Sequence, residues 1–383
     1  MILKQSKISV FNVMQGLLFP SMVTSVHTEG IKYAGSKKKL LKDILSLARD
    51  LPGETIWDAF SGTTRVSQAF AQNNYKVISS DRSVWSEYFA TCYLKNHKSR
   101  SYYQELFDHL NSLPPVDGWF SEHYGSVLSQ VDGGRKTPWQ LHNTRKLDAI
   151  RTEIDRLNLP PVEKAVALTG LILALDKVDN TLGHYVSYLK KWSARSYDEL
   201  YLTVPELFPN EQEHIVLRND VFNLTQQVQA DIAYFDPPYG SNNDKMPPSR
   251  VLYSSFYHVW TTICLNDRPD TFGQANRRID SSDSISGSPF EDFRKSDNNR
   301  YIAIEAIDKL IRETQTTYII LSYSSGGRAT ADELKDVLSS NGTILKIREI
   351  DYKKNVMADM RWTNDWVKEV ESPNKEFLFV LKK

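Results

Sequence analysis

The chain has 383 residues, a length that corresponds to two or three domains at about 150 residues per domain. Hydrophobic residues make up 40% and charged residues 25%, as in ordinary globular proteins, so a disordered or collagen-like chain is excluded. Lysine and arginine together number 47, as do aspartate and glutamate. The formal net charge is therefore zero, which excludes a polybasic, histone-like protein but leaves room for a locally basic groove.

The cysteine content and the first residues bear on the compartment. Two cysteines, Cys92 and Cys264, can build neither a disulfide framework nor a cysteine zinc site. The apolar run at residues 8–14 follows two lysines, as in a signal peptide, but it is too short to span a bilayer. We therefore expect a cytoplasmic protein with no membrane partner. Met22 is an alternative start, in which case residues 1–21 are a dispensable extension.

The first half of the chain opens with a helix and a strand–helix–strand unit. Leucines and isoleucine at helical spacing predict a helix over residues 37–50, ended by Pro52 and Gly53. Residues 55–57 predict a buried strand that runs into Asp58, and residues 66–71 suit a helix. Residues 76–80 predict a second strand that ends at Asp81. The unit has the size of a βαβ crossover, which indicates an α/β sheet.

The second half resumes the strands after an insertion. Residues 97–215 contain no strong strand pattern, and their apolar stretch 165–175 predicts a buried helix. Strands are predicted at 215–217, 231–235 and 318–323, whereas the polar segment 241–300 is expected to form loops. Residues 343–347 and 377–381 are expected to form a terminal antiparallel pair. The predicted strands thus fall into two blocks.

The sharpest chemical signal is Asp236-Pro237-Pro238-Tyr239, directly after an apolar strand. Two prolines fix the backbone and remove two amide donors. Asp236 and the Pro237 carbonyl can together accept both hydrogens of an exocyclic amino group, and Tyr239 can stack on a planar heterocycle. Carboxyl ends of strands are where open α/β sheets bind ligands. The alternative is a turn that only caps the strand, as in most Asp-Pro-Pro sequences, but the added tyrosine and the preceding strand favour a functional site.

A second signal follows the first strand. In Asp58-Ala59-Phe60-Ser61-Gly62-Thr63 a small glycine-containing turn lets the backbone approach a ligand. Asp81, at the end of the next strand, is placed to accept hydrogen bonds from ribose hydroxyls.

In this order, the motifs resemble those of the Dam-like α group of DNA amino methyltransferases. Asp58 to Thr63, Asp81 and Asp236 to Tyr239 are similar to the group's motifs I, II and IV, and residues 32–37 (Lys-Tyr-Ala-Gly-Ser-Lys) to its motif X. Weaker matches are Asn219 to Phe222, which resembles motif III, and residues 256–258 and 321–323 downstream. The chain departs from the family at Tyr33, usually Trp, and at Thr64, usually a second glycine, where a β-branched residue restricts the backbone.

The resemblance implies a fold and a domain organisation. It implies an α/β, Rossmann-like methyltransferase sheet carrying a mainly helical target-recognition insertion. The expected divisions are an N-terminal extension (1–31), a first catalytic part (32–96), the insertion (97–215) and a second catalytic part (216–383). The aromatic residues of the insertion would either stack on bases or form a second core.

The resemblance also implies a reaction: transfer of a methyl group from S-adenosylmethionine (AdoMet) to the amino group of adenine in double-stranded DNA, after base flipping. A cognate restriction endonuclease is an expected partner. The implied catalytic residues are Asp236, Pro237 and Tyr239, and the implied cofactor-binding residues are Tyr33, Gly35, Lys37, Asp58, Phe60, Gly62, Thr63, Asp81, Asp220 and Asp236.

Three alternatives remain open at this point. Methylation of the cytosine amino group uses a similar site, which more often begins with serine in place of Asp236. Methylation of RNA adenine fits the large insertion less well. From another class, the chain would be a catalytically silent DNA-binding subunit, which Thr64 favours. The histidines show no metal-ligand spacing, so no metal site is expected.

Overall fold

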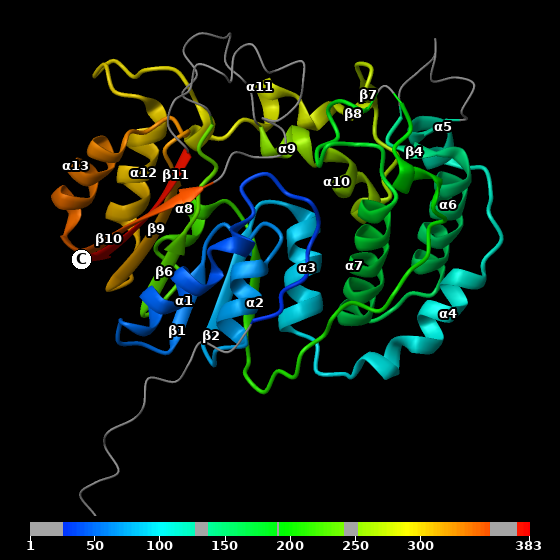
Figure 1. The fold of residues 1–383 in the computed structure, drawn as a ribbon, viewed down its shortest axis with the longest axis horizontal. Helices are drawn as coiled ribbons and strands as arrows, with labels where there is room; N and C mark the ends of the chain where they lie inside the picture. Colours follow the sequence, from blue (N-terminus) through cyan, green and yellow to red (C-terminus); the bar gives the residue numbers. More distant parts are fainter. Residues whose placement is uncertain (1–25, 127–136, 190, 241–251, 353–373) are drawn as a thin grey trace, which may run out of the picture.

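The computed structural model describes residues 26–126, 137–189, 191–240, 252–352 and 374–383 (Figure 1). Its main sheet has seven strands in the order β10-β11-β9-β6-β1-β2-β5. All neighbouring strands are parallel except that β11 runs antiparallel to both β9 and β10. The expected Rossmann-like α/β sheet is confirmed. Its strands are β1 (Thr55–Asp58), β2 (Lys76–Asp81), β5 (Ile215–Arg218), β6 (Ile232–Phe235), β9 (Tyr318–Ser324), β10 (Thr343–Tyr352) and β11 (Asn374–Lys382).

The sheet has its switch point at β1. From β1 the chain moves outward to β2 and then β5, and it returns on the other side of β1 as β6. The carboxyl ends of β1 and β6 therefore border the crevice where open α/β sheets bind ligands. Asp58 ends β1 and Asp236 directly follows β6, so the topology brings two sequence-predicted residues to one edge.

Helices cover both faces of the sheet, as Figure 1 shows. On one face α1 (Leu41–Arg49) and α2 (Arg65–Ala71) pack on alternate strand residues, including Ile56 and Val77. On the other face α8 (Val221–Leu224), α12 (Ile302–Glu313) and α13 (Ala331–Asn341) pack on Trp57 and Phe235. Neighbouring residues of a strand point to opposite faces, so a strand buried on both reads as a continuous apolar run.

The insertion forms a second hydrophobic core beside the sheet. It contains α4 (Gln104–Ser112), α5 (Trp119–Tyr124), α6 (Leu141–Arg156) and α7 (Pro161–Lys177), and α7 lies next to α3 (Val84–Leu94) in Figure 1. Tyr124, Trp139 and Tyr185 are fully buried in this core. The sequence left open whether the aromatic residues of the insertion stack on bases or form a second core. For these three residues the structure shows a core. The described residues also form two short ladders: β3 (Gly125–Ser126) with β4 (Trp139–Gln140), and β7 (Thr271–Phe272) with β8 (Arg277–Arg278).

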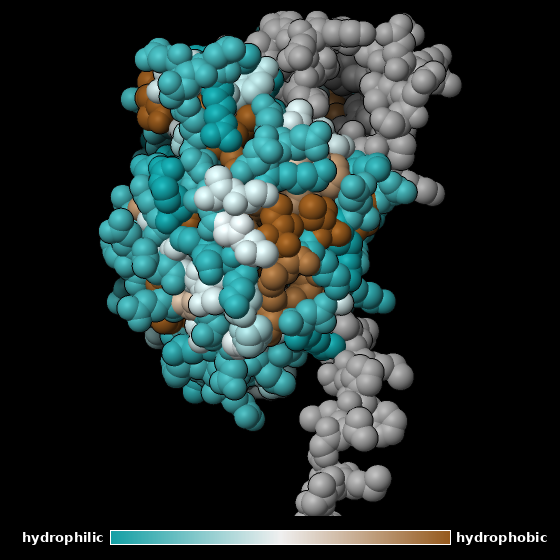
Figure 2. Space-filling model, turned by 90° about the vertical axis from the view of Figure 1, so that its left-hand side faces the viewer, coloured by the Kyte–Doolittle hydropathy of each residue, from teal (hydrophilic) through white to brown (hydrophobic). Residues whose placement is uncertain are grey.

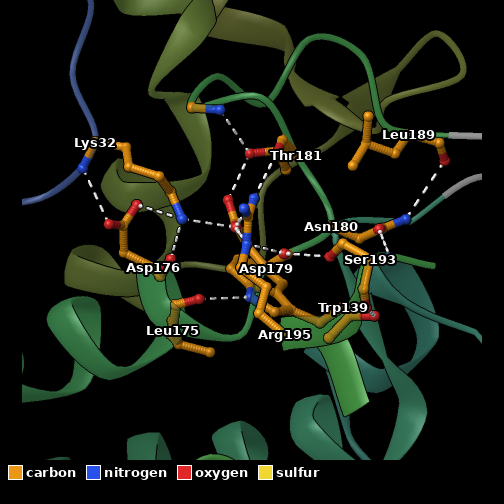
Figure 3. Close-up of polar contacts among 12 residues, drawn as sticks. Lys32, Trp139, Leu175, Asp176, Asp179, Asn180, Thr181, Leu189, Ser193 and Arg195 are labelled. Carbon is orange, nitrogen blue, oxygen red and sulfur yellow. Dashed lines mark hydrogen bonds and ion pairs between the residues drawn. The ribbon is translucent and has the colours of Figure 1, made fainter. Parts of the chain in front are cut away.

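A buried polar network joins the insertion to the segment before the sheet (Figure 3). Asp179, whose side chain is fully buried, lies 2.8 Å from Lys32 Nζ and 2.7 Å from an Arg195 guanidinium nitrogen. The Lys32 backbone amide donates to Asp176, near the end of α7, at 3.0 Å. Lys32 is the first residue of the motif X segment, so the network fastens the start of that segment to the insertion.

The expectation that residues 241–300 form loops is wrong for part of that segment. Residues 241–251 lie outside the described residues, but helices α9 (Tyr253–Phe256), α10 (His258–Leu265) and α11 (Asp283–Ser286) follow. In α10, Val259, Trp260 and Ile263 are completely buried in the second core. Helical spacing of these apolar residues was the available signal, and the polar average of the longer segment obscured it.

A smaller correction concerns residues 37–50. The expected helix is divided into a 3₁₀ turn at Lys37–Lys39 and α1. Among the described residues, the other 3₁₀ turns are Arg100–Tyr103, Ala194–Tyr197, Ile279–Ser281 and Pro289–Glu291. The expected antiparallel pair is confirmed as β10 and β11, with β11 placed between β10 and β9.

The face of the molecule on the side of β10 carries exposed apolar residues. Figure 2 views the molecule from the β10 side and shows an apolar patch surrounded by hydrophilic residues. On the edge strand β10, Leu345 and Ile347 are 48% and 39% exposed.

Among the described residues, no helix is long and apolar enough to cross a bilayer.

Candidate active site

A cavity of about 400 Å³ lies at the carboxyl edge of the sheet and extends to α10. Its lining combines carboxylates, aromatic rings and small residues. Of the sequence-predicted residues, the lining includes Tyr33, Gly35, Phe60, Asp81, Asp220, Asp236, Pro237 and Tyr239. Lys37, Asp58, Gly62 and Thr63 lie outside the lining. The structure thus brings eight of the twelve predicted residues to one cavity.

Asp236 and Tyr239 face each other across one buried ammonium group. Lys37, only 5% exposed, places Nζ 2.8 Å from Asp236 Oδ1 and 3.4 Å from the Tyr239 hydroxyl. Burial raises the pKa of Asp236 to about 6, against the opposing effect of the Lys37 charge. Burial also raises the pKa of Tyr239, so its ring stays neutral at physiological pH. Lys38 and Lys39 are exposed, so only the first lysine of the run reaches the site.

The loop after β1 contacts two carboxylates, Asp58 and Asp81, of which Asp58 is buried. Asp58 Oδ2 accepts a hydrogen bond from the Ser67 hydroxyl in α2 at 2.6 Å, while Oδ1 has no hydrogen-bond partner among the described residues. Burial raises the pKa of Asp58 to about 7. Asp58 therefore supports the loop from behind and does not line the cavity.

Asp81 fastens this loop to β2. Its Oδ2 accepts from the Gly62 amide at 2.9 Å, and its Oδ1 accepts from the Ser83 amide at 2.8 Å. A carboxylate has about four acceptor positions, so capacity remains on the cavity side. Burial raises the pKa of Asp81 above its ordinary value, against these amide hydrogen bonds. Asp81 thus has a structural contact in addition to its position at the cavity.

Thr64, the residue at which the chain departs from the family pattern, has left-handed backbone angles (φ 60°, ψ 10°). Its amide donates to Ser61 O, and its hydroxyl accepts from Gln68 Nε2 at 3.0 Å. The side chain is completely buried and points away from the set of cavity-lining residues toward α2. The turn expected there forms with threonine in place of glycine.

The motif X segment contributes an aromatic wall. Tyr33 stacks on Tyr257 at 4.6 Å between ring centroids, and the Tyr257 hydroxyl accepts from the Ala34 amide at 2.7 Å. Gly35 has φ +76°, and a side chain there would meet the hydroxyls of Tyr253 and Tyr239 at about 3.0–3.1 Å. Glycine is required because both the backbone angle and the space exclude a larger residue.

The opposite wall combines apolar rings with a helix start. The Phe60 ring packs edge-on against Phe290 at 5.3 Å. Asp220 caps α8 by accepting from the Phe222 amide at 3.0 Å, and its carboxylate is 39% exposed. The wall therefore offers a carboxylate beside an apolar surface.

The sequence motifs did not identify several residues that line the cavity. Tyr253 and Phe290 line the cavity, as does Glu291, which accepts from the Tyr253 amide at 3.0 Å. Burial raises the pKa of Glu291 to about 7. They belong to a segment with no strand-end pattern, so a scan of strand ends could not find them. Glu376 was also missed: its Oε1 lies 3.2 Å from Lys37 Nζ.

Comparison with known proteins gives the family. The sequence profile of the D12 class of N6 adenine-specific DNA methyltransferases matches residues 33–315. The chain belongs to this class. The matched range begins at Tyr33 and includes the cavity walls up to α12, but it excludes β9, β10 and β11.

Proteins similar in sequence to the chain include modification methylases. The chain is 28% identical to the modification methylase StsI of Streptococcus sanguinis over 85% of its own length and 48% of that protein. It is 28% identical to the modification methylase LlaI of Lactococcus lactis subsp. lactis, over 80% and 48% of the two chains. The chain thus spans about half the length of these two relatives. The Type II methyltransferase M.NlaIII of Neisseria lactamica is 28% identical over 82% of the chain and 89% of that protein.

Proposed function

We propose that this D12-class protein transfers a methyl group from AdoMet to the exocyclic amino group of adenine in double-stranded DNA. The observation that carries the proposal is the position of Asp236-Pro237-Pro238-Tyr239, which lines the cavity at the switch point of the sheet. Modification in a restriction system, with a cognate endonuclease as partner, and a cytoplasmic location are parts of the same proposal.

The cavity suits AdoMet in its chemistry. AdoMet carries a cationic sulfur, a charged amino group, ribose hydroxyls and a purine. Carboxylates of Asp81, Asp220 and Asp236 face this space, beside the apolar surface of Phe60 and Phe290. We assign Tyr33, Gly35, Phe60, Asp81, Asp220 and Asp236 to direct cofactor contact. Asp58, Gly62 and Thr63 shape the loop that borders the cavity, and Lys37 contacts Asp236.

The bound cofactor supplies an electrophilic methyl group on a positively charged sulfur. Asp236 and the Pro237 carbonyl accept the two hydrogens of the target amino group and direct its lone pair toward that methyl. Methyl transfer would form the carbon–nitrogen bond as the carbon–sulfur bond breaks, and the amino nitrogen would become positive before it loses one proton to solvent. The Asp236 carboxylate stabilises this developing charge more than the ground state, which lowers the barrier.

The target base must leave the duplex, because its amino group is otherwise paired and stacked. Tyr239 offers its ring for stacking on the flipped base, a contact of about 1–3 kcal/mol.

We assign target recognition to residues 97–215, between the two catalytic parts 32–96 and 216–383. Residues 26–31 of the expected N-terminal extension pack on the sheet domain, since Arg65 donates to Gly30 O at 2.6 Å; residues 1–25 lie outside the described residues.

The test is to incubate the protein with genomic DNA and methyl-labelled AdoMet, digest the DNA to nucleosides and identify the labelled one. We expect the label in N6-methyl-2′-deoxyadenosine. Label in N4-methyl-2′-deoxycytidine would replace adenine by cytosine as the target. No label, with no AdoMet binding by calorimetry, would mean a silent DNA-binding subunit.

A further inference from the structure

Asp236 belongs to an ion cluster of three side chains from distant parts of the chain. Lys37 Nζ lies 2.8 Å from Asp236 Oδ1 and 3.2 Å from Glu376 Oε1. The Gly35 carbonyl accepts from the same ammonium at 3.1 Å. Side-chain exposures of 5% for Lys37 and 6% for Glu376 separate the cluster from bulk water. Solvent screening is weak at such a place, so the sign of each charge affects its neighbours.

The antiparallel strand explains how Glu376 reaches this edge. Because β11 runs opposite to the parallel strands, its beginning lies at their carboxyl ends, where Asp236 follows β6. Glu376 is the third residue of β11. The Ser322 hydroxyl of β9 donates to Glu376 Oε1 at 2.9 Å and holds the carboxylate in place.

The net charge of Lys37, Asp236 and Glu376 bears on how the cluster affects the reaction. Lys37 alone would neutralise Asp236, and a neutral pair stabilises a developing positive charge poorly. The Glu376 carboxylate changes the total of the three ionised groups to −1, so a negative field remains beside Asp236.

We propose that Lys37 and Glu376 are positioning residues that set the charge state of Asp236, with Lys37 favouring its ionised form and Glu376 restoring net negative charge to the cluster. The inference rests on the proposed function and deepens it. The match between the family profile and the chain ends at residue 315, before Glu376.

The two residues should have opposite effects on the ionisation of Asp236. Lys37 lowers the pKa of this carboxyl group and Glu376 raises it, on top of the larger increase from burial. Other groups near the cluster are Asp58 on β1, whose pKa is raised to about 7, and four tyrosines with raised pKa values, at positions 33, 234, 239 and 253. The tyrosines are neutral over the relevant pH range, so the titrating background comes from Asp58 and from Glu291 of the cavity lining, whose pKa is also raised to about 7.

The experiment compares wild type with Lys37→Met, Glu376→Gln and the double variant. The first readout is the pH dependence of single-turnover methylation of genomic DNA fragments with saturating AdoMet. Since activity requires ionised Asp236, we expect the acid limb to move up by at least one pH unit in Lys37→Met and down in Glu376→Gln. The double variant should lie between the two. Lys346→Met and Glu349→Gln on β10 serve as matched surface controls.

A second readout needs no DNA. Carbon-13 NMR of aspartate-labelled protein follows the Asp236 carboxyl group directly, with Asp236→Asn to assign its signal. Opposite shifts of the titration midpoint would support the proposal even if wild type methylated no DNA, an outcome that would reject the proposed function alone. Unchanged midpoints, or shifts in one direction in both variants, would overturn the inference while leaving methylation intact. If Lys37→Met does not fold, Glu376→Gln still decides through its downward shift.

Discussion

Thr64 shows how a single residue can depart from a motif while the turn is kept. Its left-handed backbone costs an L-residue with a Cβ about 1–2 kcal/mol, a cost that glycine avoids. The hydroxyl contact with Gln68 compensates for part of this strain. Threonine at position 64 therefore meets a backbone requirement that glycine would meet without strain.

Comparing Thr64→Gly with Thr64→Ala isolates the strain, because both variants lose the hydroxyl. Glycine relieves the left-handed strain but adds about 0.5–1 kcal/mol of unfolded-state entropy. We expect the glycine variant to have the larger free energy of unfolding, by about 0.5–1 kcal/mol, in urea denaturation. Equal stabilities would mean that residue 64 is not left-handed in solution.

Asp58 gives a pH-dependent prediction. Its folded pKa of about 7 lies above the unfolded value of about 3.9, so the folded state retains a proton that the unfolded state has lost. The contribution of Asp58 to stability is therefore present at low pH and is lost as pH rises from about 4 to 7. Asp58→Asn keeps an acceptor for Ser67 and removes this titration.

We expect Asp58→Asn to gain stability relative to wild type as pH rises through this window, with no further gain above it. Urea denaturation of both proteins at pH 5 and pH 8, without cofactor, measures the change. A difference between the two proteins that is the same at both pH values would reject the raised pKa.

Among the helices and strands, the sequence predicted those features that depend on neighbouring residues in the chain. Strand ends at Asp58, Asp81 and Asp236 were readable because apolar runs stop at acidic residues. The contact between Lys37 and Glu376 could not be predicted from the sequence, because it depends on the position of β11 between β9 and β10. A sequence pattern shows which residues end a strand, but not which distant strand supplies a neighbour.

The polar network around Asp179 is the element-scale contact most open to test. Asp179→Asn removes the charge that holds Lys32 and Arg195. Hydrogen bonds to charged groups contribute about 1.5–3 kcal/mol, so we expect a loss of about that size in the free energy of unfolding. The matched control is Asp198→Asn, an exposed aspartate in the same loop, with a change below about 0.5 kcal/mol. A loss equal to that of the control would show that the network does not fasten the insertion.

At the scale of the whole molecule, the cavity lies where the sheet meets the second core. Its lining comes from the ends of β1, β2 and β6 and also from His258 and Leu265 of α10. The sheet side was predictable from motifs, because each motif follows a strand. The α10 side was not, since its residues contribute through tertiary packing and follow no strand end. A ligand in this cavity contacts both parts of the molecule.

In the proposed reaction, Asp236 at this cavity promotes methyl transfer. Single-turnover methylation by wild type and Asp236→Ala, measured together with equilibrium binding to the same DNA, tests this role. Losing an interaction that strengthens in the transition state should cost at least about 3 kcal/mol, a hundredfold or more in rate, with DNA affinity little changed. Methylation by Asp236→Ala at a rate near that of wild type would contradict the account and place the active site elsewhere.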